Sequence, residues 1–173
     1  GIHIDYDEKQ REVQRTYLDD LGNPIITLDG YSVIQTEYDE KDNPIKVRYY
    51  IYNSGKLSAV RHLHGNHGYY SVFDKNGNEI ERYFVDENEQ PTTIVSGVYG
   101  KRMTYEKDSF HLLEISNINS KGELMADIDG YVTDSIVYDE NELPTIHYYL
   151  DKNGKPWENP NGIYGSIDKV DFV

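Results

Sequence analysis

A short motif, an aromatic residue followed by an acidic one, returns along this chain at a nearly constant interval. It occurs at Tyr6-Asp7, Tyr38-Asp39, Phe73-Asp74, Tyr105-Glu106 and Tyr138-Asp139, so the successive intervals are 32, 35, 32 and 33 residues. Self-similarity at a fixed period of this size is the signature of a repeat architecture. We therefore predict one domain, residues 1–173, built from five units at approximately residues 6–37, 38–72, 73–104, 105–137 and 138–173.

Other positions recur inside the units. Eleven residues after the first aromatic come Tyr17, Tyr49, Phe84, Ser116 and Tyr149, so only the fourth unit lacks an aromatic there. A glycine follows at Gly22, Gly55, Gly122 and Gly154, while the third unit has Glu89-Gln90-Pro91. The start, Ile2–Asp7, matches the end of a unit, and we expect the chain to be a fragment of a longer repeat array. Such arrays need atypical end units, and the closing segment 168–173 is a candidate for one.

Within the units, apolar residues alternate with polar ones. Ile45, Val47, Tyr49 and Ile51 fall on one face of an extended segment, which is the period of a β-strand. The alternation predicts a buried stripe made of these four residues with Val13, Tyr17, Ile80 and Phe84. It also predicts that the intervening Gln14, Lys46, Arg48 and Glu81 face water.

Turn residues separate the predicted strands. Asn76-Gly77 and Asn153-Gly154 are dipeptides that accept positive φ at low cost and reverse a strand tightly. Asp19–Gly22 and Asn53–Gly55 are related turns. The sequence therefore predicts an all-β fold, a tandem array of five β-hairpin repeats of about 33 residues. A solenoid-like arrangement and a stacked antiparallel sheet satisfy the period equally well.

Composition excludes several classes of function. The chain carries 17 Lys+Arg against 31 Asp+Glu, a formal charge of −14, so it lacks the basic footprint of a nucleic-acid-binding protein. It has no cysteine and no apolar run long enough to span a bilayer, so we expect no thiolate chemistry and no membrane insertion. The motifs G-x-S-x-G, GK[ST] and HExxH are absent. Because five units share one motif, none has a unique catalytic cluster, and we expect neither enzymatic activity nor a cofactor.

Two kinds of bacterial repeat are similar to these motifs. The segments 37–44 and 53–57 resemble the YD repeats of RHS-type surface proteins. The segment 148–157, which ends at Trp157, resembles the aromatic-glycine repeats of cell-wall-binding and glucan-binding modules. Both resemblances imply a non-catalytic β-repeat protein that is extracellular or attached to the cell surface.

Aromatic residues off the predicted stripe are the candidate ligand-binding residues. Tyr and Trp rings stack on sugar rings, and neighbouring Asp and Asn side chains can accept hydrogen bonds from hydroxyl groups. The candidates are Tyr50, Tyr52, Tyr70, Tyr83, Tyr148 and Trp157. We expect them to bind a polysaccharide such as a cell-wall glycan or a glucan. The alternative is that the repeated aromatics are core residues of a structural spacer, or of a module that binds another surface protein.

A metal site is a further hypothesis. His62 and His64 are two residues apart, so on a strand they point to one side, and the bend at Gly65-Asn66 would bring His67 round as a third ligand. Surface histidines on a hairpin are the alternative. The acidic turns Asp19-Asp20 and 127–129 are more simply turn-forming residues than calcium ligands. The segment beginning at Asp74 lacks the glycine and glutamate of an EF-hand loop.

Overall fold

The computed structural model describes residues 1–107, 109–158, 162 and 164–167, and these residues form twelve β-strands and no helix. The strands are β1 (Ile2–Tyr6), β2 (Glu12–Tyr17), β3 (Val33–Tyr38), β4 (Pro44–Asn53), β5 (Lys56–Ala59), β6 (Gly68–Phe73), β7 (Glu79–Val85), β8 (Gly100–Tyr105), β9 (Leu112–Ile118), β10 (Thr133–Tyr138), β11 (Pro144–Leu150) and β12 (Gly165–Ile167). The all-β prediction is confirmed. The chain divides into two compact units, Gly1–Val95 and Ser96–Val173. The predicted end segment 168–173 lies outside the described residues.

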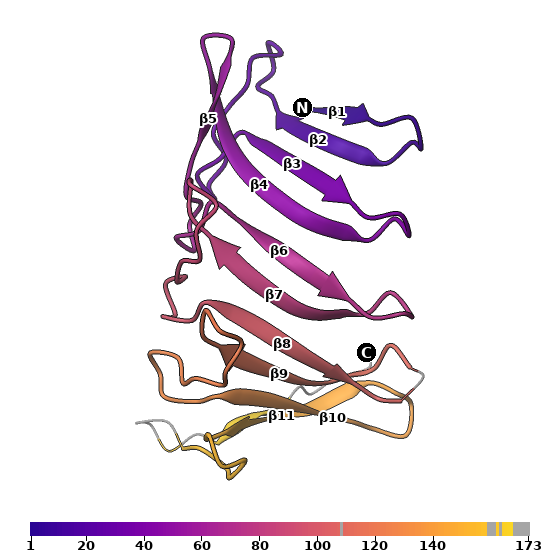
Figure 1. Ribbon diagram of the computed structural model, residues 1–173, viewed down its shortest axis with the longest axis vertical. Helices are drawn as coiled ribbons and strands as arrows, with labels where there is room; N and C mark the ends of the chain where they lie inside the picture. The colour runs from indigo at the N-terminus through magenta and orange to yellow at the C-terminus, as the bar shows by residue number, and fades with distance from the viewer. Residues whose placement is uncertain (108, 159–161, 163, 168–173) are drawn as a thin grey trace. The chain divides into compact units, whose positions relative to one another are not determined.

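The first unit holds one open antiparallel sheet in the order β1-β2-β3-β4-β6-β7 (Figure 1). Each strand lies beside its neighbour in the chain, except that the short β5 folds back along the end of β4. The ten residues of β4 make this possible. Its middle, Lys46–Arg48, pairs with β6, and its end, Tyr50–Asn53, pairs with β5. The second unit holds an antiparallel sheet in the order β8-β9-β10-β11-β12.

Within the described residues, one loop geometry recurs at eight places and accounts for these turns. The side-chain Oδ1 of the first loop residue accepts the backbone N–H groups of the residues two and four positions later. The fourth residue has positive φ in every case, which is the geometry of a type I turn followed by a left-handed residue. The loops begin at Asp7, Asp19, Asp39, Asp74, Asp86, Asn119, Asp139 and Asp151.

The fourth loop position explains the unit that lacked a glycine. Gly22, Gly122 and Gly154 occupy it with φ of 82°, 80° and 72°, whereas in the third predicted unit Glu89 occupies it with φ of 62°. Glutamate adopts this left-handed conformation at a cost that glycine avoids. The third unit therefore keeps the loop and loses only the residue type that favours it.

The missing aromatic of the fourth unit has a different explanation. Tyr17 and Tyr149 each donate N–H to the carbonyl 15 residues later and accept N–H from the residue eight positions later. In the fourth unit Asn117 makes these bonds, so Ser116 is not the equivalent residue. The hairpin before it is one residue longer, because Glu106 bonds His111 where Asp7 bonds Arg11. The constant eleven-residue offset is therefore wrong at this unit.

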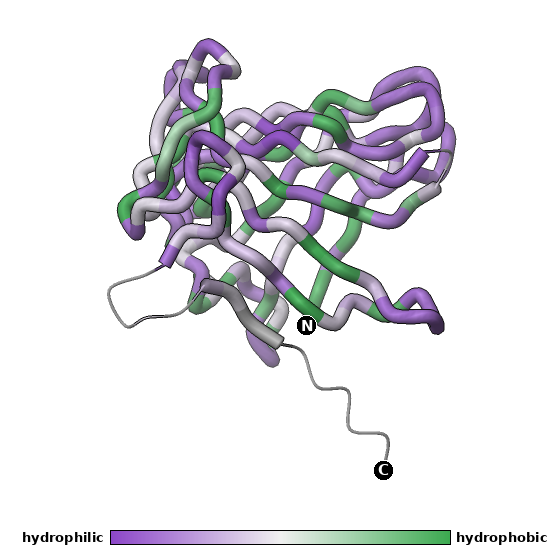
Figure 2. The backbone as a smooth tube through the Cα atoms, turned by 90° about the horizontal axis from the view of Figure 1, so that it is seen from below, coloured by the Kyte–Doolittle hydropathy of each residue, from purple (hydrophilic) through white to green (hydrophobic). Residues whose placement is uncertain are grey.

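Fully buried apolar residues are few. In the first unit Val33, Val47, Phe84 and Val85 are at most 8% exposed, whereas Val13, Ile45, Tyr17 and Tyr49 of the predicted stripe are only half-buried. Figure 2 shows short hydrophobic stretches along the backbone separated by hydrophilic turns. The prediction that Arg48 faces water is wrong, because its side chain is 3% exposed. The reason is Gly68, which stands opposite Arg48 on β6 and leaves room for the arginine side chain: a Cβ there would lie 2.9 Å from Arg48 Cδ.

Candidate functional site

A groove of about 620 Å³ lies in the first unit, over the sheet face that carries Gln14, Gln35 and Arg48. These three residues stand opposite one another on β2, β3 and β4, and residues directly opposite in a sheet share a face. The charged side chains that line the groove are Asp5, Asp7, Arg11, Glu37, Lys46, Arg48 and Glu89. The uncharged lining residues are Val13, Gln14, Gln35, Thr36, Tyr38 and Tyr50. Sequence reasoning singled out only Tyr50 among them as a site residue.

A row of hydrogen-bonded polar side chains crosses β1, β2 and β3 along this face. Gln35 Nε2 donates to Gln14 Oε1 at 2.8 Å, and Gln14 Nε2 donates to Asp5 Oδ2 at 3.0 Å. Asp5 Oδ1 in turn lies 3.2 Å from His3 Nε2. Each amide is held in one orientation by its neighbour, so the floor of the groove presents fixed donors and acceptors.

Buried Arg48 and partly exposed Glu89 form an ion pair in the lining of the groove. The Arg48 Nε and Nη2 atoms donate to the two carboxylate oxygens of Glu89 in a bidentate pair, and Tyr70 donates its hydroxyl to the same carboxylate. Arg48 Nη1 also donates to the carbonyls of Val47 at 2.8 Å and Tyr69 at 3.1 Å. The bidentate pair is the strong geometry for an arginine and a carboxylate. It holds the Asp86 loop against the sheet face 41 residues earlier in the chain.

The environment of Glu89 favours its ionised form. Its hydrogen bonds to Arg48, with those to Tyr70 and the charge of Lys46, lower the pKa of this carboxyl from 4.5 to about 2. Glu89 is also one of the few residues other than glycine with positive φ. Backbone strain of this kind persists where the surroundings hold it in place, and it gathers at functional sites. Sequence reasoning missed Glu89, although the absence of glycine from the third unit was its visible signal.

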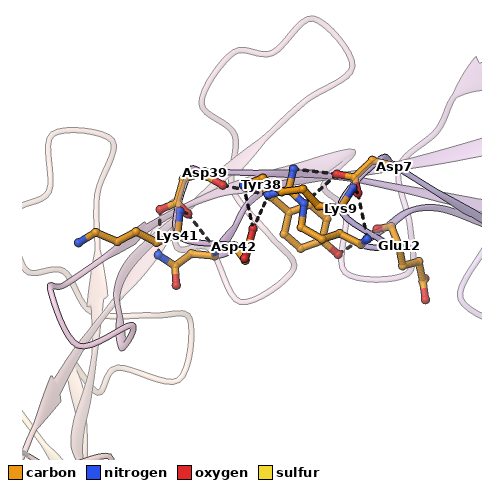
Figure 3. A network of polar contacts seen from close by, with 9 residues as sticks. Asp7, Lys9, Glu12, Tyr38, Asp39, Lys41 and Asp42 are labelled. Atoms are coloured by element: carbon orange, nitrogen blue, oxygen red, sulfur yellow. Dashed lines mark hydrogen bonds and ion pairs between the residues drawn. The ribbon is translucent and has the colours of Figure 1, made fainter.

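A second network of polar contacts lies at the Asp7 and Asp39 hairpin loops (Figure 3). Arg11 donates Nε to Asp7 at 2.7 Å and Nη1 to Asp42 at 2.7 Å, and its guanidinium lies 4.9 Å from the centre of the Tyr38 ring. Tyr38 donates its hydroxyl to the carbonyl of Glu12 at 2.9 Å. The network joins the Asp7 and Asp39 hairpin loops, so that the two turns are held together by charge.

The six predicted ligand-binding aromatics do not form one exposed row. Tyr52 and Tyr148 are each 42% exposed, and Tyr50, Tyr70, Tyr83 and Trp157 are half-buried. Tyr50 lines the groove and packs edge-to-face on His67, with ring centres 5.1 Å apart. Tyr70 and Tyr83 donate their hydroxyls to Glu89 and Glu81. In the first unit Tyr50 therefore lines the groove, and Tyr70 contacts its lining residue Glu89.

Trp157 belongs to an aromatic cluster in the second unit. Its ring lies over Gly130, where an added Cβ would approach the indole to 2.9 Å, and its centre is 6.1 Å from that of Tyr131. Tyr131 in turn lies 4.8 Å from Tyr149. A comparable cluster in the first unit joins Tyr31 and Tyr49, with ring centres 4.9 Å apart. These contacts give Trp157 a packing role.

The three histidines of the metal hypothesis lie in two places. The His62 and His64 rings are 5.0 Å apart, but His62 Nδ1 accepts the backbone N–H of His64. His67 is 2% exposed, and its Nδ1 lies 3.0 Å from the carbonyl oxygen of Val60. Among the described residues no group of three or more His, Asp or Glu side chains could hold a metal ion. The acidic turn residues Asp19 and Asp127 accept backbone N–H groups within their own loops.

No protein-family model matches the chain, and no curated protein matches it. Within the described part of the chain there is also no helix of the length and apolarity needed to cross a membrane.

Proposed function

We propose that this chain is a non-catalytic, extracellular or cell-surface repeat module that binds a polysaccharide through the groove of its first unit. The observation that carries the proposal is the lining of this groove. The hydrogen-bonded Gln14 and Gln35 amides and the Tyr50 ring line the same groove, and ring stacking combined with fixed polar groups suits the binding of a sugar.

The proposed architecture is a tandem array of five β-hairpin repeats of the YD type. The aromatic-acidic motif at intervals of 32 to 35 residues supports it, and so does the loop that recurs at eight places. In such an array each unit buries its apolar face against the next unit. Departures from the common pattern, such as Glu89, then mark the places where one unit has gained a specific role.

Co-sedimentation with insoluble bacterial cell walls and insoluble glucans tests the proposal. We expect the wild-type chain to sediment with the polymer. The apparent affinity of the Tyr50→Ala variant for the polymer should be at least tenfold weaker. Tyr164→Ala is the matched control, since Tyr164 is an exposed tyrosine of the second unit and is not one of the six candidate residues. Absence of retention on every polymer would refute the proposal.

A structural or protein-interaction spacer is the second candidate function. The observation that favours it is the row of exposed aliphatic residues at the loop tips, with Leu28 at 102%, Leu63 at 65% and Val95 at 63% exposure. Backbone bonds from Leu63 N to Asp29 O and from Val95 N to His64 O connect these loops. Pull-downs test this candidate. It would be favoured if the wild-type chain retains a partner surface protein, the Leu63→Ser variant loses it, and the wild-type chain is not retained on any glycan.

A further inference from the structure

The charged side chains of the groove indicate which kind of polysaccharide it can bind, an inference that rests on the proposed function. We propose that the groove selects an uncharged saccharide and discriminates against acidic and basic polymers. Every charged side chain in the lining of the groove already has a polar or charged partner.

Each cationic side chain of the groove already has carboxylate partners. Arg11 pairs with Asp7 and Asp42, both at 2.7 Å. Lys46 Nζ lies 3.1 Å from Glu37 and 3.5 Å from Glu89. Arg48 forms the bidentate pair with Glu89.

An anionic sugar would therefore have to displace a carboxylate already in place. The displaced carboxylate would lose its partner in a partly buried site, which costs more than an exposed pair contributes. The net charge of −14 adds long-range repulsion of any acidic polymer.

A basic polymer meets the opposite situation. The chain as a whole attracts it, but the four carboxylates of the groove are engaged: Asp7, Glu37 and Glu89 with the cations above, and Asp5 with His3 and Gln14. Attraction to a basic polymer is therefore spread over the acidic surface. It should disappear at high salt, because salt screens exposed charges beyond about 10 Å at 0.1 M and about 3 Å at 1 M.

The uncharged groups are the ones with hydrogen-bonding capacity left. Gln35 uses one N–H toward Gln14, and no other group in the described part of the chain bonds its Oε1. The Oε1 of this amide can therefore accept a hydrogen bond from one sugar hydroxyl, and its second N–H can donate to another. Tyr50, two residues after Arg48 on β4 and so on the same face, supplies a ring for the C–H side of the sugar.

Titration calorimetry with four soluble polymers tests the selectivity. Laminarin and dextran are the uncharged probes, polygalacturonate the acidic probe and chitosan oligomers the basic probe, each at 0.05 M and 0.5 M NaCl. We expect an uncharged glucan to bind with an affinity that changes less than twofold with salt. Gln35→Leu should weaken this binding at least tenfold, which corresponds to about 1.4 kcal/mol. Ser135→Ala, at the matching register of β10, should bind as the wild type does.

Gln35→Glu is a second test in case the Gln35→Leu variant does not fold. It keeps the size of the side chain and adds a charge to the groove. Far-UV circular dichroism establishes that each variant is folded, and we expect Gln35→Glu to weaken glucan binding as well. Tighter binding of polygalacturonate or chitosan than of both glucans at 0.5 M NaCl would overturn the selectivity and leave the proposed function standing. Equal glucan binding by the wild type and both Gln35 variants would overturn the assignment to the groove. Binding of no polymer at all would overturn the proposed function itself.

Discussion

Gln10 and Glu89 occupy the same position in two copies of one loop, and we predict that glycine has opposite effects at the two sites. Both residues have positive φ, 65° at Gln10 and 62° at Glu89. Glycine removes the Cβ that disfavours this conformation, a gain of roughly 1 kcal/mol. Gln10 is exposed. Gln10→Gly should therefore raise the free energy of unfolding by about 1 kcal/mol.

At Glu89 the stabilisation from relieving the left-handed backbone is opposed, because glycine also removes the carboxylate that pairs with buried Arg48. A pKa lowered from 4.5 to about 2 corresponds to roughly 3 kcal/mol. Because the Glu89 side chain is 38% exposed, solvent screening reduces this to about 2 kcal/mol. Subtracting the backbone gain of about 1 kcal/mol leaves Glu89→Gly less stable than the wild type by about 1 kcal/mol.

Urea denaturation at pH 7, followed by circular dichroism, measures both variants against the wild type. We expect the midpoints to move in opposite directions, and thermal midpoints to move by about 2–4 °C per kcal/mol. If both variants are stabilised, the Arg48–Glu89 pair contributes less to stability than the backbone gain of roughly 1 kcal/mol. If both are destabilised, the left-handed backbone carries no cost, and the reasoning about this loop fails.

Three further predictions concern the same loops and strands. Glu89→Gln should be less stable than the wild type by about 2 kcal/mol at pH 6. Because the pKa of Glu89 is lower in the folded state than in the unfolded state, acid denaturation should show this difference in the free energy of unfolding shrink as the pH falls toward 2. Asp74→Ala should lower the free energy of unfolding, measured in urea, by about 1 kcal/mol, because two backbone N–H groups lose their acceptor. Asp74→Asn should lower it by less than about 0.5 kcal/mol, because Asn119 accepts the same two bonds in its own loop. Gly68→Ala should lower the free energy of unfolding by about 3 kcal/mol, since its Cβ would meet the Val47 carbonyl at 2.1 Å; an equal cost at Gly22, which has open space and φ of 82°, would contradict this.

The local features of the fold were predictable because each depends on a few neighbouring residues. Alternation in 45–51 predicts a strand, and Asn76-Gly77 and Asn153-Gly154 predict turns with positive φ at the glycine, as observed. The eleven-residue offset fails at Ser116 because a single extra residue in the 105–112 hairpin shifts the register, and period alone does not locate an insertion.

The burial of Arg48 was not predictable from alternation. Alternation assigns a residue to a face, and it assumes that charged faces are wet. Arg48 is buried because Gly68 stands beside it on another strand and Glu89 reaches it from a loop 41 residues away. The six predicted aromatics show that alternation also does not reveal side-chain partners. Tyr70 and Tyr83 lie off the predicted stripe, yet their hydroxyls donate hydrogen bonds to the carboxylates of Glu89 and Glu81.

The sequence by itself determined the class of structure: strands from a period of two, turns from Asx and glycine, and an acidic chain without cysteine. These properties are local or compositional, so no knowledge of distant neighbours was needed. Tertiary structure alone decided the groove, because its floor joins side chains of β1, β2, β3 and β4 and its lining includes Glu89 of the Asp86 loop. Strand register sets which side chains share a face, and it arises from pairing between segments that the sequence keeps far apart.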